Sequence, residues 1–143
     1  STEGWKAFRL GSPSTALPDV LTINNTQSII FTLEAKSGTG TTLQVPFDQI
    51  ERCLQWVNNF QVYKTRKVIL AFKFLSKKRI GLSMYENRKL HEFYKEWDNK
   101  KKPINCVCTY DGKTYAICDG KRKKLYLKDF HMPFKSKYQI VLK

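Results

Sequence analysis

Residue types that act together in phosphodiester hydrolysis occur close together near the start of the chain. Pro18-Asp19 is followed, fifteen residues after the aspartate, by Glu34-Ala35-Lys36. Two carboxylates can hold a hard divalent cation such as Mg²⁺, which prefers oxygen ligands. Such a cation polarises a phosphate and helps to ionise water, and a lysine beside it orients the water and offsets developing charge. The pattern predicts Asp19, Glu34 and Lys36 as catalytic residues.

A β-hairpin is the element that must position these residues. Two runs rich in β-branched residues, Val20 to Ile23 and Ile29 to Glu34, are separated by the turn-forming residues 24–26. In such a hairpin Asp19 precedes the first strand and Glu34 ends the second, so both carboxylates meet at one end. The hairpin therefore accounts for the spacing of the two acids.

The segment Glu34-Ala35-Lys36 predicts a metal site on one face of the second strand. Glu34 and Lys36 are two residues apart, which places them on the same face of a strand. The carbonyl of Ala35 lies between them, so the expected metal ligands are Asp19, Glu34 and Ala35. The alternative is that Asp19 caps a turn while Glu34 pairs with Lys36 on a solvated face.

The net charge of +14 is concentrated in the second half of the chain. Residues 1–72 carry seven Lys and Arg against five Asp and Glu, for +2, whereas residues 73–143 carry nineteen against seven, for +12. A surface this basic attracts polyanions, nucleic acid first, with an anionic membrane or an acidic protein as alternatives. No apolar run approaches the roughly 18 residues needed to span a bilayer. We expect a cytoplasmic, nucleoid-associated protein without a membrane partner.

The remaining patterns predict an α/β protein with a mixed central sheet flanked by helices. Pro46 opens an amphipathic helix over residues 46–60, and residues 68–74 read as a central, largely apolar strand with residues 79–83 as its neighbour. A second helix is expected over residues 87–98, with Leu90, Phe93, Tyr94 and Trp97 on one face. Short strands are expected around residues 105–110, 113–118, 124–128 and 138–142.

Residues 1–102 are expected to form a core and residues 103–143 a basic, β-rich extension packed on the same domain. The extension holds the tight-turn pairs Asp111-Gly112 and Asp119-Gly120, and it is too short to be trusted as a domain of its own. Its thiols Cys106, Cys108 and Cys118, with His131, lack the C-x₂-C spacing of a zinc knuckle. We therefore expect buried, reduced thiols rather than a zinc site.

The order of these motifs resembles the archaeal Holliday junction resolvases, a family of PD-(D/E)XK nucleases. The likeness covers roughly residues 3 to 80. It is carried by the order and spacing of five short segments: Glu3 to Arg9 (EGWKAFR), Ala16 to Val20 (ALPDV), Glu34 to Ser37 (EAKS), Phe47 to Ile50 (FDQI) and Ala71 to Phe74 (AFKF).

The resemblance implies a restriction-endonuclease-like fold and Mg²⁺-dependent cleavage of four-way DNA junctions by a homodimer, with Mn²⁺ able to replace Mg²⁺. It also implies that Gln49, on the polar side of the first helix, lies beside the active site, although an ordinary surface position is the alternative. Ser14, with Ser12 beside it, matches the family's catalytic serine loop, which is shorter here. Family members carry a further acidic residue on a helix before the first strand, and this sequence begins after that helix.

The expected DNA contacts come from both halves of the chain. The basic run of residues 121–124 suits phosphate contacts, although solvated turns are the alternative. The full set is Arg9, Ser12, Arg52, Lys73, Lys121, Arg122, Lys123 and Lys124. Two other functions stay open from the sequence: a PD-(D/E)XK nuclease of the restriction or repair type, and a non-catalytic DNA-binding relative.

Overall fold

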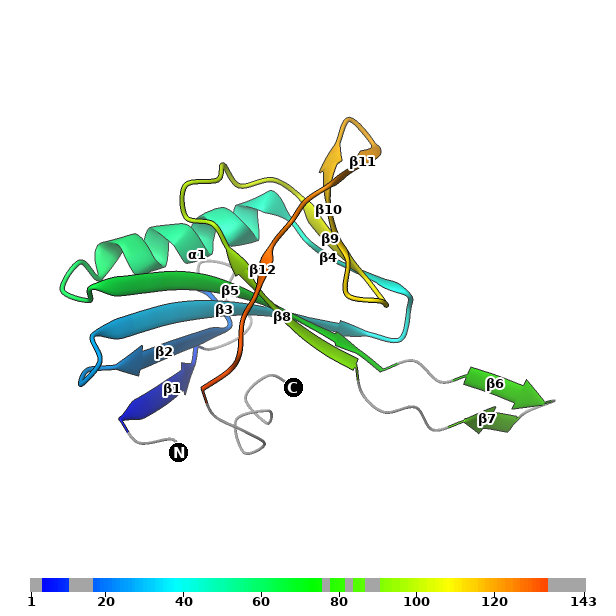
Figure 1. Cartoon of the computed structure of the whole chain (residues 1–143), viewed down its shortest axis with the longest axis horizontal. Helices are drawn as coiled ribbons and strands as arrows, with labels where there is room; N and C mark the ends of the chain where they lie inside the picture. Colours follow the sequence, from blue (N-terminus) through cyan, green and yellow to red (C-terminus); the bar gives the residue numbers. More distant parts are fainter. Residues whose placement is uncertain (1–3, 11–16, 76–77, 82–83, 87–90, 134–143) are drawn as a thin grey trace.

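The computed structural model describes residues 4–10, 17–75, 78–81, 84–86 and 91–133 (Figure 1). Over these residues the chain forms a main sheet of six strands, a second sheet of four, a separate hairpin and one helix. The elements are β1 Trp5–Arg9, β2 Val20–Asn24, β3 Ile29–Gly38, β4 Thr42–Val45, α1 Phe47–Asn59, β5 Thr65–Phe74, β6 Lys78–Gly81, β7 Met84–Glu86, β8 His91–Trp97, β9 Cys106–Thr109, β10 Thr114–Cys118, β11 Lys121–Lys124 and β12 Lys128–Asp129.

The main sheet is mixed, with the strand order β1-β2-β3-β5-β8-β12. The long central strands β3 and β5 run parallel, and every other pair in this sheet is antiparallel. A parallel pair needs a crossover, and α1 supplies it by packing on one face of β3 and β5 (Figure 1). The expected α/β class with a mixed central sheet is therefore confirmed.

Helix α1 begins directly after Pro46, as the sequence predicts. Pro46 has an extended backbone at the N-cap, where its missing N–H removes no helical hydrogen bond. One stripe of the helix is buried: Ile50, Cys53, Leu54 and Val57. This stripe packs on what we term the helix face of the main sheet, formed by Val68, Leu70, Phe72 and Phe74 of β5.

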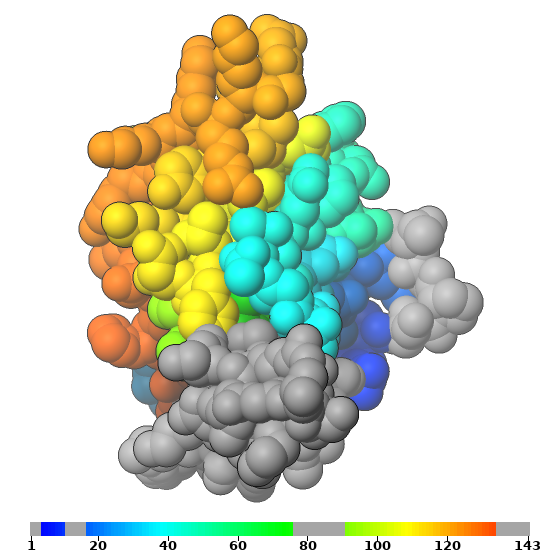
Figure 2. Space-filling view, turned by 90° about the vertical axis from the view of Figure 1, so that its right-hand side faces the viewer, coloured from blue at the N-terminus to red at the C-terminus, as the bar shows by residue number. Residues whose placement is uncertain are grey.

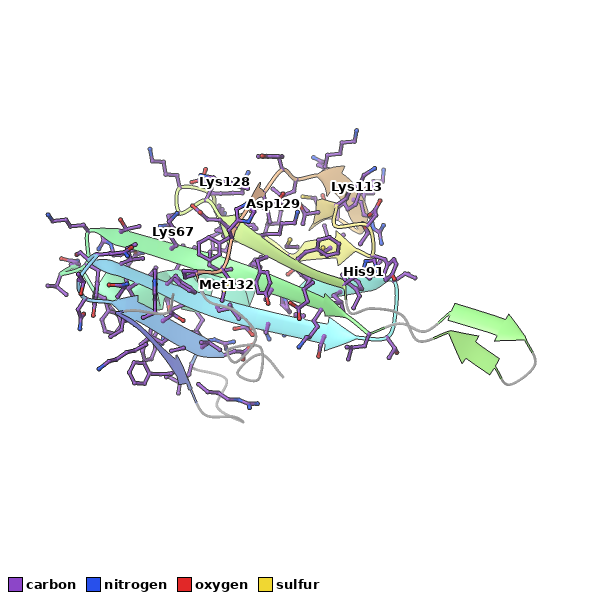
Figure 3. The ribbon with its side chains drawn as sticks, turned by 60° about the horizontal axis from the view of Figure 1, so that its bottom comes forward. Lys67, His91, Lys113, Lys128, Asp129 and Met132 are labelled. Carbon is purple, nitrogen blue, oxygen red and sulfur yellow. The ribbon has the colours of Figure 1, made fainter. Side chains whose placement is uncertain are left out.

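The opposite face of the main sheet carries a second apolar cluster. Its buried members are Val20, Phe31, Leu33, Ile69 and Ala71. Phe130 and Met132, from the end of the described chain, pack against this cluster, and Lys67 lies 5.8 Å from the centre of the Phe130 ring (Figure 3). The central strands are thus covered on both faces, which explains their continuous apolar runs.

The C-terminal strands join both sheets. In the second sheet, β9 pairs with β4 from the N-terminal half, and β10 and β11 follow by antiparallel pairing. Strand β12 instead extends the main sheet beside β8. In Figure 2 the C-terminal strands, yellow to orange, lie directly beside the cyan segment that contains β4. The strand expected at residues 138–142 lies outside the described residues.

Three expected elements are wrong, and the third is the strand expected around residues 124–128, because residues 125–127 form the connection between β11 and β12. Residues 91–97 of the expected second helix form strand β8, in which Trp97 joins the helix-face core while Tyr94 packs on the opposite face. The second error concerns the neighbour of β5, which is β8 and not the segment at residues 79–83. Its described part, β6, pairs with β7 in a hairpin that projects from the body (Figure 1). In the described chain, the helices expected to flank the sheet are therefore reduced to α1 alone.

The turn between β9 and β10 gives a direct test of this packing. Gly112 has φ +85°, and a Cβ there would lie 2.5 Å from the Phe93 ring, which packs against Phe74 in the core. Gly120 has φ +75° but open space around it. We expect Gly120→Ala to lower the free energy of unfolding by about 1 kcal/mol through backbone strain. Gly112→Ala should cost roughly 1–3 kcal/mol more through overpacking. Equal losses in urea unfolding would contradict the contact between this turn and Phe93.

Candidate active site

The β2–β3 hairpin brings Asp19 against the strand segment that holds Glu34. Val20 pairs with Leu33, so Asp19, one residue earlier, lies next to Glu34. The Ala35 N–H donates a hydrogen bond of 2.8 Å to the Asp19 carboxylate. The side chains of Asp19 and Glu34 are also hydrogen-bonded to each other. The hairpin therefore produces the expected juxtaposition of the two acids.

The Glu34 carboxylate is enclosed between β3 and α1. Its residue is only 2% exposed. Lys36 Nζ lies 3.8 Å from one carboxylate oxygen, and Arg52 approaches the other at 3.5 Å. The Cys53 thiol donates a long hydrogen bond of 3.9 Å to that second oxygen. Glu34 is therefore a buried acid held between one cation from its own strand and another from the helix.

Burial sets the protonation of Glu34. Its pKa is raised from 4.5 to about 7, first by desolvation and then by the neighbouring charge of Asp19, against the opposing effects of Lys36 and Arg52. The hydrogen bond with Asp19 acts in the same upward direction. Close to pH 7 the Glu34 carboxyl is therefore partly protonated, and a bound cation would stabilise its ionised form.

Two buried polar atoms of α1 belong to the same region. Gln49 lies three and four residues before Arg52 and Cys53, and so on the same side of the helix. Gln49 Oε1 and Arg52 Nε are both buried and have no hydrogen-bond partner in the described part of the chain. Buried polar atoms without partners are costly, so these two are suited to a bound water, ion or phosphate.

The donors gathered here fit a hard divalent cation. They are carboxylate, amide and backbone oxygens, which suit Mg²⁺ or Mn²⁺ better than zinc. The described residues hold no group of three or more His, Cys, Asp and Glu side chains suited to a metal ion. A cation here would therefore rest on Asp19 and Glu34, with backbone oxygen and water completing its coordination.

The chain matches one family model and is similar to a solved structure. The family model described as archaeal Holliday junction resolvase (Hjc) matches residues 1–104. The chain belongs to this family. A search of curated proteins gave no significant match. Among solved structures, the chain is similar to Hjc of Archaeoglobus fulgidus, titled a Holliday junction resolvase from an archaeal hyperthermophile. The identity is 18% and the TM-score 0.45, over 76% of this chain and 79% of that one.

Membership in the resolvase family confirms several expectations from the sequence. The family consists of nucleases that hydrolyse DNA and generally use a divalent metal. The mixed α/β sheet expected from the sequence is present in the described chain. The matched residues 1–104 contain β1 to β8 and α1, and hence every element that contacts Glu34.

Among the other expected site residues, Arg9 lies next to the site, whereas Lys73 and residues 121–124 lie elsewhere. Arg9 pairs with Val20 and is exposed next to the Asp19 end of the hairpin. Lys73 lies on the opposite face, 7% exposed, with Nζ 3.7 Å from Glu92. The structure does not bring it to the site. The basic residues 121–124 form β11 of the second sheet and are exposed. Ser12 and Ser14 lie outside the described residues.

Sequence reasoning missed the contacts that α1 makes with Glu34. Arg52 is expected only as a DNA contact, yet its guanidinium pairs with the buried acid, and Cys53 touches the same oxygen. Arg52 and Cys53 lie three and four residues after Gln49, and so on the same side of the helix. This spacing is the signal in the sequence that could have predicted their contacts with Glu34. Thr32 adds a further link between β3 and α1, because its hydroxyl donates a hydrogen bond of 3.4 Å to the Cys53 carbonyl.

Two of the three cysteines of the C-terminal strands lie in the core, whereas Cys118 is only half-buried at its edge. Cys106 and Cys108 are fully buried on the helix-face side. Burial raises the pKa of each thiol to about 12, so both stay protonated at neutral pH. They are free thiols, in accord with the expectation of buried, reduced cysteines. Within the described chain, no helix is both long and apolar enough to cross a membrane.

The raised pKa of Glu34 gives a prediction for stability. Because the folded-state pKa of about 7 exceeds the ordinary 4.5, the contribution of Glu34 to stability is complete below pH 4.5 and is lost as the pH rises through 7. Glu34→Gln mimics the protonated acid. Without divalent cations, we expect it to raise the free energy of unfolding at pH 8 by on the order of 1–3 kcal/mol, and to change it little at pH 4.5.

The measurement is urea unfolding at both pH values, repeated with Mg²⁺. Added Mg²⁺ should stabilise the parental protein at pH 8 and have less effect on Glu34→Gln, because the variant lacks one carboxylate ligand. Glu51→Gln, which changes an exposed acid on α1, is the control and should behave like the parent. A Glu34→Gln variant that gains nothing at pH 8 would contradict the desolvation of this acid.

Proposed function

We propose that this chain is a Mg²⁺-dependent endonuclease that resolves four-way DNA junctions by hydrolysing phosphodiester bonds. The observation that supports this most directly is the buried Glu34 carboxylate in contact with Asp19 and next to Lys36. A resting structural ion pair would not need a second carboxylate beside it, because like charges in a buried place are costly. A site that holds a cation does need it.

Each residue of the site has a distinct role in the proposal. Asp19, Glu34 and the carbonyl of Ala35 hold the cation. Mg²⁺, or Mn²⁺ in its place, supplies the charge that polarises the phosphate and acidifies water. Lys36 orients the attacking water and offsets charge developing on the phosphate. Gln49 places its unpartnered oxygen toward water or a phosphate group at the site.

Arg52 fits a positioning role better than the direct DNA contact expected from the sequence. Its guanidinium holds Glu34 in place from the helix, at 3.5 Å. The phosphate contacts are assigned instead to Arg9, next to the site, and to the exposed residues 121–124 of β11. Ser14 and Ser12 are retained as candidates from the family's serine loop.

The substrate proposal follows from symmetry and charge. A four-way junction has two-fold symmetry, and paired cleavage requires two active sites, so we propose a homodimer. Sequence-independent phosphate contacts position a duplex but carry no base information, and junction choice would come from shape. Since the proposed substrate is DNA, we also propose that the protein acts in the cytoplasm, at the nucleoid.

Substitution of Glu34 or Lys36 should abolish DNA cleavage but not DNA binding. We expect Glu34→Gln and Lys36→Ala each to reduce cleavage of a four-way junction at least about a hundredfold. DNA affinity should stay near the parental value, because it depends on dispersed phosphate contacts. The assay pairs cleavage with fluorescence anisotropy. The matched controls are Glu51→Gln and Lys64→Ala, which change an exposed acid and an exposed lysine outside the site. Cleavage at the parental rate by either site variant would refute the assignment.

Substrate preference is tested by competition between junction and linear duplex in Ca²⁺, which can occupy an oxygen-ligand site while usually failing to support cleavage. A junction preference of at least about tenfold should persist as salt rises, since nonspecific phosphate binding fades first. Equal affinities at every salt concentration would favour a PD-(D/E)XK nuclease of the restriction or repair type. Binding without any metal-dependent cleavage would favour a non-catalytic relative.

A further inference from the structure

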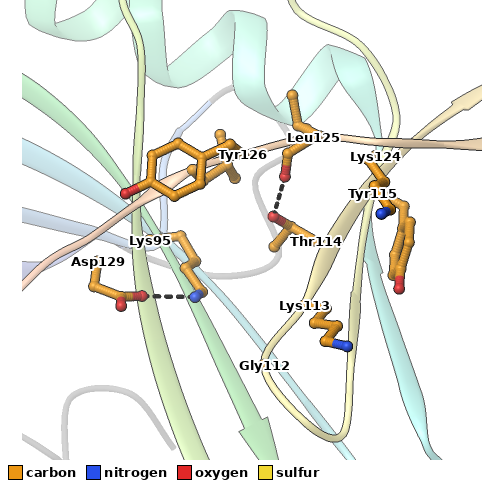
Figure 4. Close-up of a pocket in the computed structure, with 10 residues that line it drawn as sticks. Lys95, Gly112, Lys113, Thr114, Tyr115, Lys124, Leu125, Tyr126 and Asp129 are labelled. Carbon is orange, nitrogen blue, oxygen red and sulfur yellow. Dashed lines mark hydrogen bonds and ion pairs between the residues drawn. The ribbon is translucent and has the colours of Figure 1, made fainter.

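Two cavities flank the segment that connects β11 to β12. One, of about 410 Å³, lies between this segment, β8 and the β9–β10 turn, and the other, of about 470 Å³, lies toward the loop after β8. Tyr126 and Leu127 line both. Figure 4 shows the first cavity, with Tyr126 on one side and Lys113 and Lys124 on the other. We term the two cavities together, with Tyr126 between them, the Tyr126 groove.

Tyr126 presents its ring to solvent from a fixed backbone. The residue is 87% exposed, whereas its neighbours Leu125 and Leu127 are 7% and 5% exposed and belong to the helix-face core. Leu125 is also tied to Thr114, whose hydroxyl donates to the Leu125 carbonyl at 2.5 Å and whose carbonyl accepts from the Leu125 N–H at 3.2 Å. The two leucines therefore hold the ring outward, and little ordering is needed before it binds a partner.

The Tyr126 ring is available for stacking, unlike the other tyrosine of the groove. Tyr115 is covered by the Arg122 guanidinium, 5.5 Å from its ring centre. Within the described chain, no hydrogen bond or ring contact engages the Tyr126 side chain. A large, flat and amphipathic group is thus left open to solvent at the centre of the groove.

The acids of the groove already have partners, whereas several of its lysines extend into solvent. Asp129 pairs with the buried Lys95 at 2.6 Å, Glu96 pairs with Lys67 at 3.0 Å, and Asp98 accepts from the Lys100 N–H. The solvent-facing lysines on the two sides of Tyr126 are Lys113 and Lys124 in one cavity and Lys100 and Lys128 in the other. Lys113 also lies 3.9 Å from Asp111, in a pair whose two side chains are both exposed. Figure 3 shows Lys113 and Lys128 at separate positions along this surface.

We propose that the Tyr126 groove binds an unpaired stretch of DNA, with one base stacked on the Tyr126 ring and the neighbouring phosphates on the lysines of the two cavities. An exposed aromatic side chain between cations is the chemistry that binds single strands, because every base has a π-face and every nucleotide a phosphate. Bases inside a duplex stack on each other and cannot use the ring. The groove therefore selects DNA whose bases are unstacked.

This inference rests on the proposed action on DNA and adds a second binding site to it. Most of the groove comes from residues 112–129, beyond the residues 1–104 that the resolvase family model matches. The site is thus a feature of this chain's C-terminal strands. In a branched substrate it would hold nucleotides that lose their pairing near the branch, while the Asp19–Glu34 site acts on the backbone.

The test measures the affinity of the full chain for two probes in Ca²⁺ by fluorescence anisotropy. The probes are an oligothymidine of about 20 nucleotides, long enough to cover a typical single-strand site, and a duplex of the same length. Tyr126→Ala and Tyr126→Leu should weaken oligothymidine binding about tenfold and duplex binding less than about twofold. Tyr126→Phe, which keeps the ring, is the matched control and should bind both probes as the parent does.

The lysines give an independent readout. Lys113→Gln with Lys128→Gln should flatten the log–log salt dependence of oligothymidine binding by roughly 0.7 for each phosphate that the protein no longer neutralises. Each of three outcomes would overturn the proposal that the groove binds unpaired DNA. They are an unchanged oligothymidine affinity in Tyr126→Ala, equal losses of affinity for both probes, and a loss in Tyr126→Phe as large as that in Tyr126→Ala. Cleavage by Glu34→Gln at the parental rate would refute the active site alone. A parent that binds neither probe would refute the DNA function together with the groove.

Discussion

The burial of the Glu34 carboxylate between β3 and α1 is the constraint on which the rest of the arrangement depends. An ionisable group in such a place must be compensated, and the compensating cations are Lys36 from the same strand and Arg52 from the helix. Asp19 from the hairpin instead places a like charge beside it. The parallel pairing of β3 with β5 requires a crossover, and the crossover helix is what carries Arg52 to the acid. The fold and the site are therefore consequences of one topology.

The two faces of the main sheet carry different sets of residues. The helix face carries the core beneath α1 and, midway along β3, the buried Glu34. The opposite face carries a smaller apolar cluster and the ion pairs of Lys73 with Glu92 and Lys67 with Glu96. A charge on that face is separated from the site by the thickness of the sheet, so the basic residue Lys73 stabilises structure although its type alone suggests a role in DNA binding.

Local patterns in the sequence are sufficient for the elements that build the site, and insufficient for those joined by distant pairing. The β2–β3 hairpin, α1 and β5 each carry their own periodicity, and the juxtaposition of Asp19 with Glu34 follows from the hairpin alone. The residues of strand β8 predict a helix because their apolar members also match helical spacing. In the strand, Lys95 and Trp97 are buried on one face while Tyr94 and Glu96 are half-buried on the other. The charge of Lys95 argues against a buried position in the sequence, and its partner Asp129 is far along the chain.

The uneven charge of the chain has a physical reason in this structure. The half that contains the Asp19–Glu34 pair has a net charge of only +2, while the basic half, at +12, supplies β11 and the Tyr126 groove on other elements. Many cations next to Glu34 would lower its pKa and compete with a divalent cation for the two carboxylates. Exposed charges more than about 8–10 Å away are largely screened at physiological salt. Cations on the second sheet can therefore contact DNA phosphates while leaving the protonation of the buried acid to its own neighbours.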